Sequence, residues 1–335
     1  MSTLREAENT ACSSWRMRPF FATIGRAAAA MELPYTSYSR YLSEVHGEKT
    51  YRVSVDGGFS CPNRESGAGC TFCSEDGARA PYLRSAGGLR DQVEKAVAFL
   101  RKRYGAESFL LYFQASCGTN APASELARIY GYTLSLMPFR ELVVGTRPDC
   151  IDEEKAKLLE SYIDSNLAVW VELGLQSASD KTLSRIRRGH TTAEFTRAYA
   201  LCKRHGLKVA VHLIFGLPGE SALDMAATVR FVSGFMPDGV KIHNLHIPAS
   251  AAMAEEFPKG ELTTPGPRRH LEYVISALEM LPPQTVIMRL TTDTPGDRLL
   301  SPRYFWDKQI FASRLAEEMG KRATRQGRLF KPDGD

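Results

Sequence analysis

Short apolar runs alternate with longer amphipathic stretches along most of the chain. The six runs span residues 51–55, 109–114, 141–146, 168–176, 207–216 and 239–247. Each is nearly continuous in apolar residues, which is typical of strands buried on both faces of a parallel sheet. The stretches with helical periodicity span residues 89–104, 122–137, 152–164, 191–206, 221–235 and 268–281. The alternation predicts an α/β fold, either an open doubly wound sheet or a partial barrel.

The two ends of the chain depart from this pattern. Residues 1–34 lack a clean apolar segment and contain an alanine run, so we expect a disordered extension, with Met31 as an alternative start. We assign residues 46–283 to the core domain and residues 284–335 to a C-terminal extension with a strand, an amphipathic helix and a basic tail. No apolar run reaches the length of a membrane span, so no membrane partner is expected.

Three of the seven cysteines, Cys61, Cys70 and Cys73, fall within thirteen residues. An odd number of clustered cysteines favours a metal site in a reducing cytoplasm over a secreted disulfide framework. The cluster begins just after the first predicted strand. In α/β folds, ligands bind beyond the carboxyl ends of the strands, so the fold and the cysteines indicate the same edge of the sheet.

Two interpretations of these cysteines treat them as a closed or redox site. A structural zinc ion needs four ligands, and only one CxxC pair is present, so Cys117, Cys150 or a histidine would have to complete it. That interpretation describes a zinc-stabilised, non-catalytic nucleic-acid-binding protein. A redox pair in Cys-Thr-Phe-Cys would suit a smaller thioredoxin-like fold and would leave Cys61 unexplained.

A third interpretation gives the missing fourth ligand a purpose. Three thiolates can hold three irons of a [4Fe–4S] cluster and leave the fourth iron open. An open coordination position is typical of a catalytic metal site. The amine and carboxylate of S-adenosylmethionine (SAM) could fill it as a chelate. An electron passed from the reduced cluster to the sulfonium would then cleave a carbon–sulfur bond and yield a 5′-deoxyadenosyl radical.

The motifs resemble those of the radical SAM superfamily, in which the last cysteine pair typically encloses an aromatic residue, here Phe72. The resemblance is closest to a branch similar to the catalytic subunits of Elongator and grouped as YhcC-like, and it covers roughly residues 35–328. It is carried by VSVDGGFSCPN (53–63), LLYFQA (110–115), GTRPDC (145–150), VWVELGLQS (169–177), RRGH (187–190), VHLIFGLPGE (211–220) and VKIHNLH (240–246). It implies a partial (β/α)6 TIM-type barrel with a small C-terminal α/β extension. It also implies a [4Fe–4S] cluster, SAM and an electron donor such as flavodoxin or ferredoxin.

The resemblance implies that Cys61, Cys70 and Cys73 bind the cluster and that Phe72 and Ile214 lie near the adenine. Other candidates lie where strands end at the same edge, and each also has a structural interpretation. Gln114 could contact SAM or cap its strand, Arg147 could bind a carboxylate or belong to a salt-bridged turn, and His212 could contact a ligand or belong to the core.

Two further candidates for ligand binding, Glu172 and Gln176, share a strand face with Gly174, which leaves room between them. Buried acid and amide groups need partners, and a ligand would supply them.

The resemblance also suggests a substrate. Elongator-like relatives act on wobble uridines of tRNA, and part of this branch is associated with converting a 5-carboxymethylaminomethyl uridine towards the 5-aminomethyl form. A net charge of +5 permits a polyanionic partner without requiring one. The chain departs from the branch in regions expected to meet the substrate, where Met288 replaces a common histidine and Thr292 a common glycine. These departures leave the substrate open.

Overall fold

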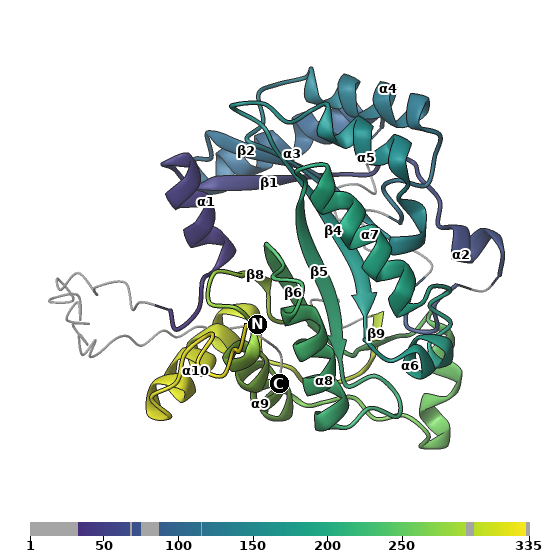
Figure 1. Cartoon of the computed structure of the whole chain (residues 1–335), viewed down its shortest axis with the longest axis vertical. Helices are drawn as coiled ribbons and strands as arrows, with labels where there is room; N and C mark the ends of the chain where they lie inside the picture. Colours follow the sequence, from purple (N-terminus) through teal and green to yellow (C-terminus); the bar gives the residue numbers. More distant parts are fainter. Residues whose placement is uncertain (1–32, 68, 75–86, 115, 293–297, 333–335) are drawn as a thin grey trace, which may run out of the picture. The chain divides into compact units, whose positions relative to one another are not determined.

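The main sheet of the computed structural model contains seven parallel strands in sequential order, β1-β2-β3-β4-β5-β6-β8 (Figure 1). The structure describes residues 33–67, 69–74, 87–114, 116–292 and 298–332. The strands of this sheet are β1 Thr50–Val55, β2 Ser108–Phe113, β3 Glu141–Thr146, β4 Ala168–Gln176, β5 Lys208–Phe215, β6 Gly239–Asn244 and β8 Val286–Arg289. Because the order never reverses, the sheet winds in one direction, as in a barrel, and is not doubly wound. The predicted partial barrel is confirmed.

Helices follow the strands and pack along the outer side of the curved sheet (Figure 1). The longer ones are α3 Leu89–Tyr104, α4 Ala123–Leu134, α5 Glu153–Glu160, α7 Thr192–Arg204, α8 Ala222–Ser233, α9 Pro267–Met280 and α10 Lys308–Lys321. Shorter elements are α1 Tyr38–His46, α2 Pro62–Glu65, α6 Asp180–Arg185, η2 Pro148–Cys150, η3 Ala252–Glu255 and η4 Phe257–Lys259. None of the described helices is long and apolar enough to cross a membrane.

The two faces of the sheet have different chemistry. On β4, Val169, Val171 and Leu173 face the helices and belong to the main hydrophobic core. Trp170 and Glu172 occupy the alternate positions and point into the barrel, because successive side chains of a strand point to opposite faces. All of these residues are buried. Burial on both faces explains why the strand is nearly continuous in apolar residues.

The sheet has one strand more than the six assigned to the barrel from the sequence. The strand predicted within residues 285–295 is present as β8 and pairs in parallel with β6, with Gly239 opposite Val286. The C-terminal extension therefore contributes to the main sheet, while its boundary at residue 284 stays a prediction. A separate two-stranded antiparallel sheet joins β7 Ile247–Pro248 to β9 Leu299–Ser301. The extension predicted for residues 1–34 lies almost wholly outside the described residues.

Helix α1 is tied to the N-terminal ends of the central strands. The Tyr38 hydroxyl donates a hydrogen bond to Oε2 of Glu141 at 2.5 Å, and Nε2 of His46 lies 3.3 Å from Oε1 of the same carboxylate. Glu141, the first residue of β3, is fully buried. The ring of Tyr38 also packs edge-on against Trp170, with 6.2 Å between centroids. A buried carboxylate needs such partners, so α1 and β3 stabilise one another.

Replacing Tyr38 by Phe tests this attachment. The change removes one hydrogen-bond donor from a buried carboxylate, so we expect the free energy of unfolding to fall by about 1–3 kcal/mol, measured by urea denaturation. Tyr132→Phe on α4 is the control, because its ring is exposed and should contribute less than about 0.5 kcal/mol. Equal stability of the two variants would show that the Tyr38–Glu141 contact does not hold α1 in place.

Candidate active site

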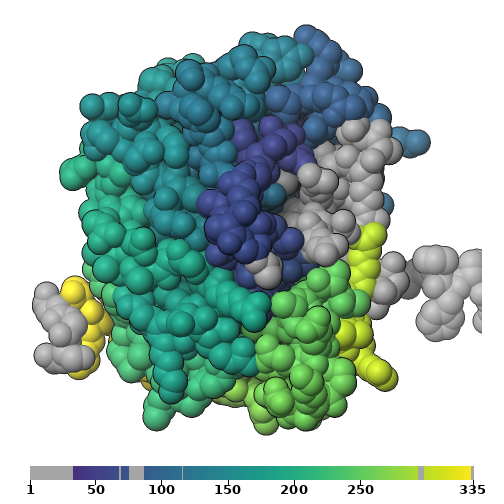
Figure 2. Space-filling model, turned by 90° about the vertical axis from the view of Figure 1, so that its right-hand side faces the viewer, coloured from purple at the N-terminus to yellow at the C-terminus, as the bar shows by residue number. Residues whose placement is uncertain are grey.

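The segment after β1 carries the three clustered cysteines at the C-terminal edge of the sheet. Cys61 precedes α2, and all three thiols are free. Two backbone hydrogen bonds tie the segment to distant parts of the chain: Thr71 N donates to Ile186 O at 3.0 Å, and Met253 N donates to Thr71 O at 2.9 Å. Figure 2 shows the segment, in purple, at the surface between teal and green parts of the chain. The loop is therefore fixed at both sides although it contains little regular structure.

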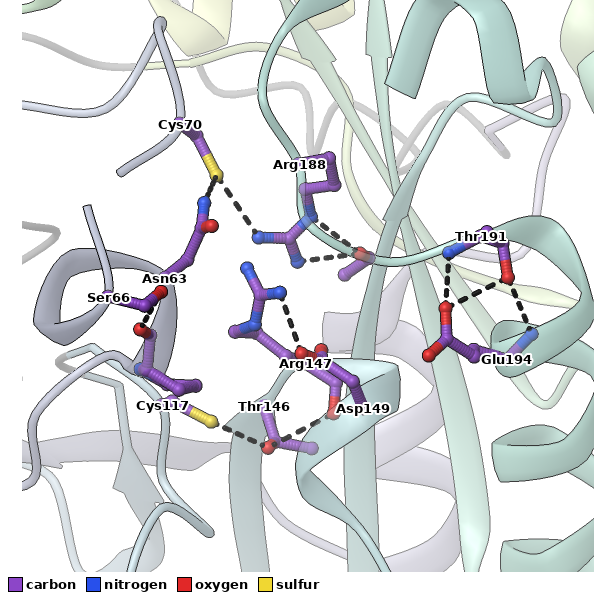
Figure 3. Close-up of polar contacts among 12 residues, drawn as sticks. Asn63, Ser66, Cys70, Cys117, Thr146, Arg147, Asp149, Arg188, Thr191 and Glu194 are labelled. Atoms are coloured by element: carbon purple, nitrogen blue, oxygen red, sulfur yellow. Dashed lines mark hydrogen bonds and ion pairs between the residues drawn. The ribbon is translucent and has the colours of Figure 1, made fainter. Parts of the chain in front are cut away.

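Donor groups converge on the sulfur of Cys70, which is 6% exposed. Asn63 Nδ2 lies 3.3 Å from this sulfur, and Arg188 Nη1 lies 3.5 Å from it (Figure 3). Asn63 also donates to the carbonyl of Arg187 at 2.7 Å, which holds the amide in place. Hydrogen bonds and positive charge favour the thiolate, which is the form that binds metals.

Positive charge surrounds the other two cysteines as well. Arg64 interacts electrostatically with all three thiols, and Arg147 with those of Cys61 and Cys70. Burial raises the pKa of Cys61, while the backbone amides of Asn63 and Arg64 and the charge of Arg147 oppose that shift. Guanidinium groups are therefore placed to compensate negative charge on this loop.

Arg147 follows β3 and is 4% exposed. Its Nη2 pairs with Asp149 at 2.8 Å, so the salt-bridged turn expected from the sequence is present. Its Nε and Nη1 are also buried, and neither has a hydrogen-bond partner among the described residues. In Figure 3 the guanidinium points toward Arg188 and the cysteine segment. Buried donors need acceptors, so Arg147 has capacity for an anionic ligand in addition to its ion pair.

Arg188 occupies the space that Gly174 leaves on β4. Its Nε and Nη2 donate to the Gly174 carbonyl at 3.2 and 2.7 Å. A Cβ at position 174 would lie 2.5 Å from Arg188 Nη2 and 2.8 Å from Gln176 Nε2. Gln176 itself has a positive φ of 78° at the end of the strand. The room predicted at Gly174 therefore holds a protein side chain from the loop between α6 and α7.

Glu172 lies deeper in the barrel and has protein partners for its carboxylate. Lys241 Nζ contacts both oxygens, while the Tyr112 hydroxyl donates to Oε2 at 2.6 Å and His212 Nε2 lies 2.8 Å from it. Burial would raise the pKa of Glu172, but Lys241 and His212 hold that pKa well below its ordinary value. Burial lowers the pKa of Lys241, and the charge of Glu172 opposes that shift and keeps the ammonium in the ion pair. Glu172 and His212 lie together here, and their proposed contact with cofactor stays a prediction.

The remaining candidates lie at the edge of the sheet. Phe72 packs against the hydrophobic cluster that contains Ile214, Leu217 and Leu245, so the two residues expected near the adenine are brought together. Gln114 follows β2, and its Oε1 accepts a hydrogen bond from Ser54 at 3.3 Å. Phe72 and Ile214 thus belong to one apolar cluster and Gln114 lies at a strand end, while contact of these residues with SAM stays a prediction.

The closed zinc site considered from the sequence is not seen in the described part of the chain. Among the residues that the structure describes, no three His, Cys, Asp or Glu side chains gather as ligands of a single ion. The Cys117 thiol instead lies 3.1 Å from Thr146 Oγ1 and hydrogen bonds with Cys150, which lowers the pKa of Cys117 to about 6. In a [4Fe–4S] cluster each thiolate binds a different iron, so that cofactor does not require the sulfurs to meet at one point.

Sequence reasoning missed Asn63 and Lys241. Asn63 lies in CPN between the first two cysteines, and nothing in that motif indicates a separate role for its amide. Lys241 stands within the run VKIHNL, and a lysine inside a predicted buried strand is a signal that a carboxylate partner is near. Glu172 was already a candidate, so the two could have been paired.

Comparison with known proteins then decides the family. Residues 58–232 match the family described as the radical SAM superfamily, and residues 237–321 match the radical SAM C-terminal domain. The chain belongs to the radical SAM superfamily. Protein YhcC of Escherichia coli K12 is 36% identical over 301 residues, which cover 87% of this chain and 95% of YhcC. The YhcC-like membership expected from the motifs is confirmed.

Two other relatives are more distant. The structure of Elp3 from the archaeon Methanocaldococcus infernus has a TM-score of 0.65 at 20% identity, covering 83% of this chain and 64% of that one, which shows a shared fold. A tRNA uridine(34) acetyltransferase of the same organism is 32% identical over 159 residues, which cover 46% of this chain and 29% of that protein.

Radical SAM enzymes use a [4Fe–4S] cluster and SAM, so the cofactor prediction is confirmed at the level of the family. The residues at this edge fit both groups. Cys61, Cys70 and Cys73 would supply three soft anionic ligands in a basic environment. Arg147 has two buried donors, Nε and Nη1, that lack an acceptor among the described residues. A carboxylate could accept hydrogen bonds from both.

Replacing Gly174 by Ala should disturb this radical SAM site through Arg188. The new methyl group would displace the guanidinium, which costs about 1–3 kcal/mol of stability and weakens its contact with Cys70. We expect less iron retained after anaerobic reconstitution and a lower urea midpoint. Gly320→Ala in α10 is the matched control, because a Cβ there meets nothing within 4 Å. Equal iron content in both variants would contradict the role assigned to Arg188.

Proposed function

We propose that the chain reductively cleaves SAM at a [4Fe–4S] cluster bound by Cys61, Cys70 and Cys73. When bound, the cluster supplies the electron that breaks a carbon–sulfur bond of SAM and yields the 5′-deoxyadenosyl radical. The observation that carries this proposal is the group of three free thiols facing buried guanidinium donors at the C-terminal edge of a partial barrel.

The protein side chains position and shield these groups. Asn63 and Arg188 hold the Cys70 sulfur and favour its thiolate form. Arg147 offers Nε and Nη1 to the SAM carboxylate, while Phe72 and Ile214 offer an apolar surface to the adenine. Cys70, Arg147 and Arg188 are buried, which excludes water from their contacts and strengthens them. The electron comes from a small donor protein such as flavodoxin or ferredoxin, and the enzyme acts in the cytoplasm.

We further propose that the substrate is a wobble uridine of tRNA, remodelled from the 5-carboxymethylaminomethyl towards the 5-aminomethyl form. The partial similarity to a tRNA uridine(34) acetyltransferase supports a tRNA substrate. The net charge of +5 agrees with a polyanionic partner. Met288 and Thr292, which depart from the branch, lie on β8 and three residues beyond its end. These departures affect substrate choice and leave the cluster residues unchanged.

Cys73→Ala tests the cofactor chemistry. Loss of one of three thiolate ligands should abolish 5′-deoxyadenosine formation and reduce bound iron well below about four per chain, measured after anaerobic reconstitution. Cys202→Ala is the matched control, because Cys202 is buried in the core on α7 and should keep both properties. A wild-type protein that takes up zinc but assembles no cluster would support the non-catalytic alternative and overturn the proposal.

The tRNA proposal has a separate test in cells. Deleting the gene should change the abundance of 5-carboxymethylaminomethyl and 5-aminomethyl wobble uridines, measured by mass spectrometry of tRNA nucleosides. Complementation with the wild-type chain should restore the profile, while the Cys73→Ala chain should not. An unchanged profile in the deletion strain would exclude this substrate and leave the SAM chemistry standing.

A further inference from the structure

A cavity of about 390 Å³ lies at the seam of the partial barrel, apart from the cysteine segment. The edge strands β1 and β8 stand at opposite ends of the sheet order and do not pair with one another. Both line the cavity, β1 through Thr50 and Arg52 and β8 through Met288 and Arg289. Helices α1 and α10 complete its wall. A volume of this size falls within the range of sites for small ligands.

Two arginines that line this cavity form no ion pair with any carboxylate in the described ranges of the chain. Arg52 and Arg289 are both half-buried, and neither guanidinium forms a hydrogen bond or ion pair with any residue in the described part of the chain. The Arg52 guanidinium lies 4.8 Å from the centre of the Tyr112 ring, which holds one of its faces. A guanidinium has five N–H donors, and a half-buried one normally satisfies several of them with an acceptor.

The charge around the cavity is strongly unbalanced. Its described lining contains Arg52 and Arg289 and no Asp or Glu, and a third cation, Lys308, has an interaction of its own. Glu172 lies behind it in the barrel, but Lys241, Tyr112 and His212 already occupy that carboxylate. Arg289 adds positive charge near Lys241, His212 and His243, and it contributes to the lowered pKa of each. A bound anion would relieve this repulsion.

We propose that the seam cavity binds an oxyanion, a carboxylate or a phosphate, carried on an apolar body. Arg52 and Arg289 bind the oxyanion from the two edge strands, because a guanidinium can donate two parallel hydrogen bonds to a carboxylate or a phosphate. Leu42, Leu110 and Phe311 supply apolar contacts for the rest of the ligand. The inference rests on the proposed function when the bound molecule is the substrate, and it then assigns an anionic group to that substrate.

The test is calorimetric titration of the reconstituted enzyme with phenylphosphate, benzoate and neutral benzamide, without SAM or reductant. We expect one or both anions to bind and benzamide to bind at least tenfold more weakly. Arg52→Gln and Arg289→Gln should each weaken anion binding by about tenfold or more, since each removes a charge-assisted hydrogen bond. Arg128→Gln on α4 removes the same charge from an exposed position and should leave binding unchanged. The preferred anion distinguishes a phosphate from a carboxylate.

Three results would overturn the proposal: no anion binds, benzamide binds equally well, or neither arginine variant changes the affinity. A thermal melt separates ligand binding from a structural role. Because neither guanidinium forms a hydrogen bond or ion pair in the described part of the chain, the variants should melt close to the wild-type temperature when no ligand is present. A lower melting temperature with unchanged binding would show that the arginines are structural. If arginine-dependent binding persists but no 5′-deoxyadenosine forms, the cavity assignment stands and the proposed function fails.

Discussion

The ion pair between Glu172 and Lys241 fixes the interior of the barrel. Both residues are 1% exposed, so both charges have been removed from water at a large cost. That cost is offset only when every remaining polar atom finds a partner, and Tyr112 and His212 complete the arrangement. The four residues come from β2, β4, β5 and β6, so the network joins four strands across the concave face of the sheet.

This network also sets what the rest of the site can do. Because Glu172 is engaged inside the barrel, the groups that remain for ligands lie above it and beside it. Above it, Arg188 lies on Gly174 and reaches the Cys70 sulfur. Beside it, Arg52 and Arg289 face the seam cavity without a carboxylate of their own in the described structure. The edge of the sheet that carries the cysteine segment and the seam cavity are thus two electropositive regions, separated by the ion pair of Glu172 and Lys241.

Much of this could be predicted from the sequence. The six predicted strands are present, and their continuous apolar character follows from burial on both faces. The cysteine spacing with Phe72 identified the superfamily and the cofactors. The position of that loop after the first strand predicted which edge of the sheet carries the site, because ligands in such folds bind beyond the strand ends. These features are local, so they can be recognised in the sequence without knowledge of the contacts between distant segments.

The residue pattern along the chain was enough to predict the fold class, the family and the edge of the sheet on which the three clustered cysteines lie. Three features became visible only in the folded structure. Strand β8 extends the sheet, and Lys241 forms an ion pair with Glu172, 69 residues away in the sequence. Arg52 and Arg289 line one cavity. The physical reason is that a buried charge is stable only when a suitable partner lies opposite it. Strand register and sheet curvature decide which residue lies opposite. Neither can be derived from residue spacing along the chain.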